Sequence, residues 1–183
     1  MALVESLPLT LGTALPSFSL SDPFGKEHST QDVMGSKGLL VIFTCNHCPY
    51  ALAIWDRLIA LSLWAKPLGI HTVAVNPNIH PNYPDDAPEK MKEKIQQWQI
   101  PFPYLVDESQ DIARQYQAQC TPDLYLLDSN HHLVYHGQLD NNWKEPEKVT
   151  RQDLKDAIQI FVNGAVNSEK QYPSMGCSIK WKK

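Results

Sequence analysis

The sequence lacks long hydrophobic runs and any excess of positive charge. No apolar segment approaches the roughly 20 residues that a membrane-spanning helix needs. The 183 residues carry a formal net charge of −4, so electrostatics give no reason to expect nucleic-acid binding. Residues 1–5 show no basic stretch leading into an apolar core, as a secretory signal would. These absences predict a cytoplasmic protein that binds neither membranes nor nucleic acid.

Cysteine is also scarce, and several catalytic patterns are missing. Four cysteines are too few for a disulfide scaffold in a chain of this size. The sequence contains no glycine-rich phosphate loop, no dinucleotide fingerprint and no Ser–His–Asp pattern. Hydrophobic content of 43% and charged content of 20% favour a globular protein. The length predicts a single domain, 1–183.

What the sequence does contain is a Cys-x-x-Cys pair in a place that favours thiol chemistry. Cys45 and Cys48 follow an apolar run at 39–43 and precede an amphipathic segment from Tyr50 to about Ala65. This pattern predicts strand, tight turn and helix, with both sulfurs at the helix start. A helix N-terminus offers free N–H groups and partial positive charge, which stabilise a thiolate. The pair therefore indicates redox chemistry.

Further along the chain, strand and helix patterns alternate. The order β-α-β-α-β-α-β-β-α predicts a mixed central sheet with helices on both faces. Ahead of it, strands at 16–20 and 26–29 form an N-terminal hairpin extension. We expect an extended arm at 1–15, a polar loop at 76–88 and an irregular tail at 173–183. The remaining predicted elements are strands at 70–75, 104–106, 123–127 and 132–136, and helices at 89–98, 109–116 (N-cap Ser109) and 151–162 (N-cap Thr150).

Several short motifs together resemble a known family. They are Thr44-Cys45-Asn46-His47-Cys48-Pro49, Cys120-Thr121-Pro122-Asp123, Tyr135-His136-Gly137 and the segment 176–182. With the opening segment, they resemble the peroxiredoxin-like (AhpC/TSA, redoxin) branch of the thioredoxin superfamily, and within it bacterial thioredoxin-family proteins with a CNHC motif. The resemblance extends from about residue 14 to the end and implies a thioredoxin-like fold.

The resemblance also implies an activity and a set of site residues. It implies a thiol–disulfide oxidoreductase in which Cys45, the more exposed cysteine, attacks a substrate disulfide and Cys48 resolves the mixed disulfide. Pro122 is expected to be cis, which leaves the Thr121 backbone free to pair with an extended substrate chain. The supporting residues are Thr44, Asn46, His47, Cys120, Thr121 and Pro122.

His47 and the two remaining cysteines carry further hypotheses. An imidazolium at His47 would stabilise the Cys45 thiolate and raise the reduction potential above the thioredoxin value of about −270 mV; the alternative is exposed turn polarity. Cys120 is either a secondary thiol near the motif or a small buried residue. Cys177 is either a resolving thiol on a mobile tail or part of a docked C-terminal strand.

Departures from the family pattern keep a peroxidase as the alternative. If Cys48 takes the place of the peroxide-reacting cysteine, Cys45 replaces the usual threonine and Val41 the usual proline. The arginine that peroxiredoxins bring to the site is also replaced, around Pro122. A thiol peroxidase with Cys48 as attacking thiolate and Cys45 as resolving thiol remains open. Against thioredoxins, Ile42 stands where a buried acid is usual, so the proton acceptor for Cys48 is unidentified.

A third hypothesis is a zinc protein that uses the four cysteines or His47. For the redox readings we expect no cofactor and no metal. The partners would be a protein or small-molecule disulfide or thiol, and an electron donor such as a thioredoxin-type protein or glutathione. The sequence allows a monomer or a homodimer.

Overall fold

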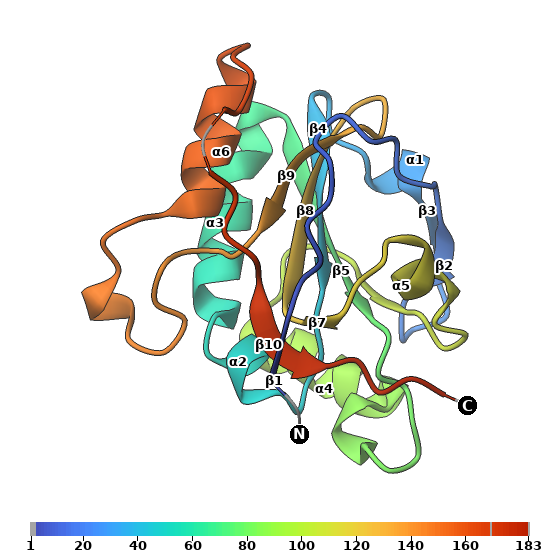
Figure 1. The fold of residues 1–183 in the computed structure, drawn as a ribbon. Coiled ribbons are helices and arrows are strands. Elements are labelled where there is room, and N and C mark those ends of the chain that lie inside the picture. Colours follow the sequence, from blue (N-terminus) through green and yellow to red (C-terminus); the bar gives the residue numbers. More distant parts are fainter. Residues whose placement is uncertain (1–2, 169, 183) are drawn as a thin grey trace.

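A computed structural model describes residues 3–168 and 170–182 (Figure 1). Its centre is a five-stranded mixed sheet with the order β6-β5-β4-β8-β9. Strands β4, β5 and β6 run parallel, and β8 and β9 continue the sheet antiparallel. The bounds are β4 Gly38–Phe43, β5 Ile70–Asn76, β6 Tyr104–Val106, β8 Asp123–Asp128 and β9 Leu133–Gly137.

The central strand β4 is buried along its whole length. Successive side chains of a strand point to opposite faces, so Leu40 and Ile42 join one apolar cluster while Val41 and Phe43 join another. The predicted mixed sheet with helices on both faces is therefore confirmed: α3 and α6 cover one face, and α1 and α5 the other (Figure 1). The bounds are α1 Thr30–Val33, α2 Pro49–Leu52, α3 Trp55–Ala65, α4 Pro88–Trp98, α5 Asp111–Gln115 and α6 Asp153–Val162, with 3₁₀ turns at Lys66–Leu68, Pro84–Asp86 and Pro146–Lys148.

The N-terminal hairpin extension is present as β2 Ser19–Ser21 and β3 Glu27–Ser29, which pair antiparallel. Ser29 then caps α1. Its side chain accepts a hydrogen bond from the Asp32 N–H, and the Asp32 carboxylate accepts one from the Ser29 N–H at 2.9 Å. This capping box ties the hairpin to the first helix.

The prediction of an irregular tail at 173–183 is wrong for residues 175–178, which form a strand. β10 (Met175–Ser178) is the middle strand of a second, three-stranded sheet, between β1 (Leu3–Glu5) and β7 (Cys120–Thr121). Part of the arm predicted at 1–15 is thus a paired strand. Residues 1–2 and Lys183, which these predictions included, lie outside the described part of the chain. The second sheet pairs β1 with β10 beside the start of α2 (Figure 1).

Three helix boundaries differ from the predictions. The helix expected from Tyr50 to Ala65 breaks at residues 53–54, where the Ala53 carbonyl faces Arg57 Nη2 at 3.5 Å. Ser109 is not an N-cap, because Gln110 adopts a left-handed conformation and α5 starts after it. Thr150 is not an N-cap either. Asn141 Oδ1 accepts the N–H groups of Thr150 and Arg151 at 3.0 Å, which holds both residues out of α6.

The helices that the structure describes are all too short or too polar to cross a membrane. The longest of them, α3 and α4, have 11 residues each, whereas a bilayer core needs about 20.

Candidate active site

The Cys-x-x-Cys pair lies where β4 passes into α2. The Thr44 N–H donates to the Val75 carbonyl at 2.9 Å, which carries the sheet pairing to the edge of the motif. Residues 45–47 form the turn, and Cys48 is the N-cap of α2, with Pro49 in its first turn. Proline is well placed there because its missing N–H has no helical partner in any case.

The segment β7–β8 supplies the other wall of the site. The Thr121–Pro122 peptide bond is cis, as the resemblance implied. Thr121 touches both sulfurs: its Oγ1 lies 3.1 Å from Cys45 Sγ, and its carbonyl oxygen lies 3.1 Å from Cys48 Sγ. Residues 76 positions apart in the chain thus meet at the redox pair.

Neither cysteine of the pair is exposed, so the prediction that Cys45 is the more exposed is wrong. Cys45 and Cys48 are both fully buried, in a small cluster with Ala51 and Cys177. The Tyr50 side chain packs against this cluster and against the Trp143 ring, with 4.1 Å between ring centroids. A substrate therefore reaches either sulfur only when a covering segment moves.

The two sulfurs have opposite electrostatic surroundings. A hydrogen bond from the Cys45 thiol lowers the pKa of Cys48 to about 5 against the effect of burial, with further hydrogen bonds from Cys177 and the Ala51 N–H. Burial raises the pKa of Cys45 well above its ordinary value, and the hydrogen bond to Cys48 and the negative charge of Asp86 act in the same direction. These surroundings favour negative charge on Cys48 over Cys45, whereas the Thr121 carbonyl, 3.1 Å from Cys48 Sγ, accepts a hydrogen bond only from the protonated Cys48 thiol.

Asp86 is the site residue that sequence reasoning missed. The sequence predicts a polar loop at 76–88 and does not single out Asp86, whose side chain is fully buried. Its carboxylate accepts hydrogen bonds from the Asn46 N–H at 2.6 Å, from Asn76 Nδ2 at 3.1 Å and from His47 Nδ1. No local pattern distinguishes Asp86 from its exposed neighbour Asp85, because the contacts span 39 and 40 residues to the CNHC turn.

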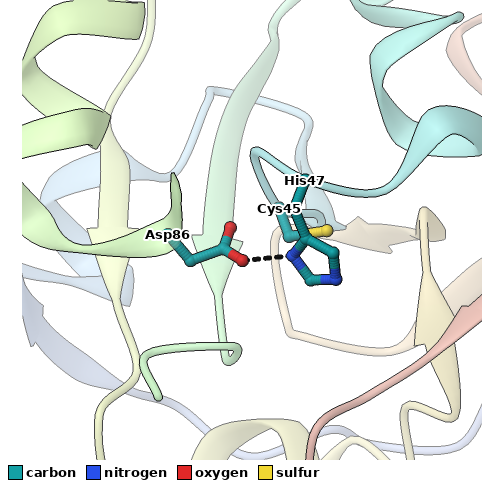
Figure 2. A group of neighbouring side chains, drawn as sticks. All are labelled: Cys45, His47 and Asp86. Carbon is teal, nitrogen blue, oxygen red and sulfur yellow. Dashed lines mark hydrogen bonds and ion pairs between the residues drawn. The ribbon is translucent and has the colours of Figure 1, made fainter. Parts of the chain in front are cut away.

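His47 is held between this carboxylate and an aromatic ring. Figure 2 shows the Asp86 carboxylate facing the imidazole, with the Cys45 sulfur beside the same ring. The other face of His47 stacks on Tyr83, with 4.7 Å between ring centroids. The His47 side chain is only 9% exposed, so the reading of His47 as exposed turn polarity is wrong.

Asn46 fixes the turn between the cysteines. Its Nδ2 donates to the Asp85 carbonyl at 2.8 Å, and its Oδ1 accepts from the Tyr104 hydroxyl at 3.1 Å. Asn46 therefore connects the motif both to the loop at 76–88 and to β6. Thr44, the other flanking residue, is fully buried.

The third and fourth cysteines take different positions. Cys177 lies in β10 directly opposite Thr121 and hydrogen-bonds to Cys48. The expectation that the Thr121 backbone is free for a substrate chain is therefore wrong, because the tail of the same chain pairs with it. Cys120 is fully buried, and its Sγ lies 3.5 Å from the Pro122 carbonyl and 3.9 Å from the Ser174 carbonyl.

A metal could be held only by a different set from the one the sequence suggested. Within the described residues, the one group of at least three ligating side chains whose atoms lie within 4.8 Å of one another is Cys45, His47 and Asp86 (Figure 2). The four cysteines do not form such a group. The Asp86 carboxylate already accepts three hydrogen bonds there, so a cation would have to displace the His47 contact.

Comparisons with known proteins agree on family and fold. The sequence model of the AhpC/TSA family matches residues 11–136. The chain is 26% identical to the thiol-disulfide oxidoreductase ResA of Geobacillus kaustophilus (strain HTA426), over 69% of this chain and 68% of ResA.

Solved structures show the same fold. The crystal structure of an uncharacterized conserved protein from Geobacillus kaustophilus superposes with a TM-score of 0.93 and 38% identity, over 100% of this chain and 97% of that one. The thioredoxin domain of a thiol-disulfide oxidoreductase from Bacteroides vulgatus superposes with a TM-score of 0.65 and 21% identity, over 85% of this chain and 100% of that one. The predicted thioredoxin-like fold is confirmed.

Proposed function

Because this chain belongs to the AhpC/TSA family, we propose that it catalyses thiol–disulfide exchange with Cys45 and Cys48 as a dithiol/disulfide pair. The observation that carries the proposal is the placement of both sulfurs in one buried cluster at the start of α2, each 3.1 Å from an oxygen of Thr121, beside the cis Thr121–Pro122 peptide. Two cysteines separated by two residues in such a turn can form a disulfide. The similarity to ResA supports the same chemistry.

The electrostatics favour Cys48 as the first nucleophile, which reverses the roles that the resemblance implied. The thiolate is the reactive form of a cysteine. The Ala51 N–H favours negative charge on Cys48, whereas the Asp86 carboxylate disfavours it on Cys45. We assign the first attack to Cys48 and the resolving step to Cys45.

The exchange then proceeds in two displacements. The Cys48 thiolate attacks one sulfur of a substrate disulfide, and the other substrate sulfur leaves as a thiolate. Cys45 next loses its proton and attacks Cys48 Sγ, which releases the second substrate thiolate and leaves a Cys45–Cys48 disulfide. The substrate gains two electrons and the protein pair loses them. The reverse sequence oxidises a substrate dithiol.

Substrates and location are part of the proposal. A protein or small-molecule disulfide or thiol would be the substrate, and a thioredoxin-type protein or glutathione would return the electrons. We place the reaction in the cytoplasm, as a monomer or homodimer. Fractionation of cells tests the location, and sedimentation of the purified protein tests the oligomeric state.

A redox titration in glutathione buffers tests the central proposal. Two-electron behaviour is expected, with a reduction potential above about −270 mV because the Cys48 thiolate is stabilised in the reduced protein. A diagonal gel of the oxidised protein should show the link between Cys45 and Cys48, and Cys48→Ser should abolish it. If the two cysteines never pair with each other, the exchange proposal is wrong.

Trapping tests the assignment of the two roles. With a disulfide substrate, Cys45→Ser should accumulate a mixed disulfide at Cys48, because the resolving sulfur is missing. Cys48→Ser should react more slowly, because the remaining Cys45 is protonated at neutral pH. Faster trapping in Cys48→Ser would return the attacking role to Cys45.

A thiol peroxidase is the second candidate, favoured by one observation: the pKa of Cys48 lies at about 5, so this sulfur is ionised at neutral pH. Peroxiredoxins bring an arginine to the site, but each of the arginines in this chain has another partner. Arg57 pairs with Asp140, Arg114 stacks on Trp181 and Arg151 pairs with Asp153. Rapid formation of a sulfenic acid at Cys48 with hydrogen peroxide would favour the peroxidase, whereas slow reaction is expected.

A further inference from the structure

The C-terminal strand occupies the edge beside the redox pair. In β10, Cys177 is in register with Thr121, and Ser178 with Cys120. A peptide that binds by strand addition pairs with an exposed strand edge through its backbone. β10 does this to β7 from within the chain, and it carries a cysteine at the position opposite Thr121. The strand thus lies as a docked cysteine-containing peptide would.

The packing of β10 is specific to this arrangement. A Cβ at Gly176 would lie 2.1 Å from the Thr121 carbonyl oxygen, so only glycine allows the strand to lie this close to β7. Beyond the strand, the Ile179 N–H donates to the Gln119 carbonyl at 3.0 Å, and the Lys180 N–H donates to Asn78 Oδ1 at 2.8 Å. Hydrogen bonds on successive residues therefore fix the tail in register.

Cys177 lies next to Cys48. The two cysteines belong to the same buried cluster as Cys45, and α2 contacts β10. Cys48 Sγ lies 3.1 Å from the carbonyl oxygen of Thr121, the residue in register with Cys177. The thiol and the backbone N–H of Cys177 both lower the pKa of Cys48. Cys48 thus has two thiol neighbours, Cys45 in the CNHC turn and Cys177 in the C-terminal strand.

We propose that Cys177 is a third redox cysteine, which forms an intramolecular disulfide with Cys48 in exchange with the Cys45–Cys48 disulfide. This proposal extends the proposed function. Beyond the exchange pair, it assigns β10 the role of an internal substrate whose sulfur competes with external thiols for Cys48. A Cys48–Cys177 bond would also lock β10 onto β7 and leave Cys45 as a free thiol.

The step is balanced without an external oxidant. Starting from the Cys45–Cys48 disulfide, Cys177 loses its proton and attacks Cys48 Sγ. The bond between Cys48 and Cys177 forms, the bond between Cys45 and Cys48 breaks, and Cys45 leaves as a thiolate that takes up the proton. One disulfide and one thiol are present before and after. When Cys45 is absent, oxidised glutathione supplies the oxidation: Cys48 attacks it, and Cys177 displaces the second glutathione.

Cys120 is a matched comparison, because it is a fully buried cysteine on the strand that pairs with β10. Its Sγ contacts the Pro122 and Ser174 carbonyls, and its register partner is Ser178. The proposal therefore predicts that Cys177, and not Cys120, bonds to Cys48.

Disulfide mapping of a Cys45→Ser variant tests the proposal. The full-length variant is oxidised with oxidised glutathione, blocked with iodoacetamide and digested with trypsin. Cleavage after lysine and arginine gives separate peptides for the three remaining cysteines: 38–57 with Cys48, 115–144 with Cys120 and 171–180 with Cys177. We expect the linked pair of peptides 38–57 and 171–180. The link should persist in Cys45→Ser/Cys120→Ser and disappear in Cys45→Ser/Cys177→Ser.

Three outcomes would overturn the proposal: a link from peptide 38–57 to 115–144, a stable glutathione adduct on Cys48 that Cys177 does not displace, or free thiols after oxidation. Circular dichroism establishes that each variant is folded. Mapping of the oxidised wild-type protein supplies a second measurement that needs no variant, and both the 45–48 and the 48–177 links are expected in it. A wild-type protein that holds only the 45–48 link at equilibrium would also count against Cys177.

Failure of the Cys48–Cys177 proposal can be distinguished from failure of the proposed function. The wild type should complete two-electron cycles through Cys45 and Cys48 in glutathione buffers. If it does and Cys45→Ser forms no link, only the role of Cys177 is lost. Gly176→Val in the Cys45→Ser background keeps all three remaining thiols but displaces β10, so it should lose the link. A link that persists would show that β10 packing does not position Cys177.

Discussion

The Cys45 side and the Cys48 side of the redox pair differ more than their closeness in sequence suggests. Cys45 lies at the end of β4, near the Asp86 carboxylate and against the Thr121 hydroxyl. Cys48 is the N-cap residue of α2; Cys45, Cys177 and the Ala51 N–H lower its pKa, and its Sγ also lies 3.1 Å from the Thr121 carbonyl oxygen. Both sulfurs are fully buried, so burial alone cannot distinguish them.

The difference shows how one fold separates two chemically identical groups. Burial disfavours a thiolate at both positions. Only the Cys48 side offers enough hydrogen-bond donors to overcome that cost, whereas the Cys45 side adds a negative charge from a distant loop. Among variants of the site, Cys48→Ser should change this asymmetry most and His47→Pro least.

The largest effect is expected from Cys48→Ser. Reduced wild-type protein should show thiolate absorbance at 240 nm that titrates near pH 5, because Cys48 ionises there. Cys48→Ser should show no thiolate until well above neutral pH, because burial and Asp86 keep Cys45 protonated. Cys120→Ser is the control and should keep the low titration. If a titration near pH 5 remains in Cys48→Ser, the thiolate belongs to Cys45, and the roles of the two sides are reversed.

The stability of the reduced protein should depend on pH through Cys48. Its folded-state pKa of about 5 lies below the unfolded value, so its contribution is full above the unfolded pKa of about 8.5 and is lost as the pH falls toward 5. The slope from one proton is at most about 1.4 kcal/mol per pH unit. Cys45, whose pKa is raised in the folded protein, affects the free energy of unfolding only above its unfolded pKa. In that range Cys45 lowers the free energy of unfolding.

Urea unfolding from pH 5 to 8 under reducing conditions measures this slope. The difference in unfolding free energy between the wild type and Cys48→Ser should grow as the pH rises through this window. Two parallel stability curves would mean that Cys48 ionises at its ordinary pKa in the folded protein.

Asp86→Asn should reduce the difference between the two sides by neutralising the carboxylate. We expect a loss of about 1–3 kcal/mol in unfolding free energy, because buried donors on Asn46 and Asn76 lose a charged acceptor. The pKa of Cys45 should fall, since a nearby negative charge is removed. Titration in the Cys48→Ser background isolates that fall. The exposed neighbour Asp85→Asn is the matched control, and equal effects in both variants would contradict a specific role for Asp86.

His47→Pro should have the smallest effect on the redox pair. An imidazolium here would favour a thiolate, but the Asp86 carboxylate bonded to Nδ1 offsets much of its charge. We therefore expect the reduction potential to fall by about 30 mV at most, which corresponds to a tenfold change in the equilibrium constant. Glutathione titration measures it, with Tyr83→Phe as a control that keeps the stacked ring. A fall well beyond that size would show that His47 acts on the sulfurs unopposed.

Local patterns in the sequence determined the fold and the position of the redox pair. The apolar run of β4 followed by the amphipathic segment places Cys45 and Cys48 at a strand–helix junction, because side-chain periodicity and turn residues act over a few positions. The same short-range signals identified the β2–β3 hairpin, whereas the role of the Thr121–Pro122 segment at the site followed from the family resemblance. Helix starts were less certain, since contacts with distant residues such as Asn141 outcompete local capping.

Only the tertiary structure decided what surrounds the two sulfurs. Asp86 reaches the CNHC turn across 39 residues, and Cys177 reaches Cys48 from the far end of the chain. Asp86 has no sequence signature, because a buried acid and an exposed one look alike in a polar loop. Cys177 lies in a segment that carries the family resemblance, but nothing in that segment shows that it reaches Cys48. β10 is likewise a short strand that is stabilised by pairing on both edges, and its sequence shows no hydrophobic alternation that would identify it. The amino-acid sequence therefore fixes which atoms can react, while long-range packing fixes which sulfur carries the charge.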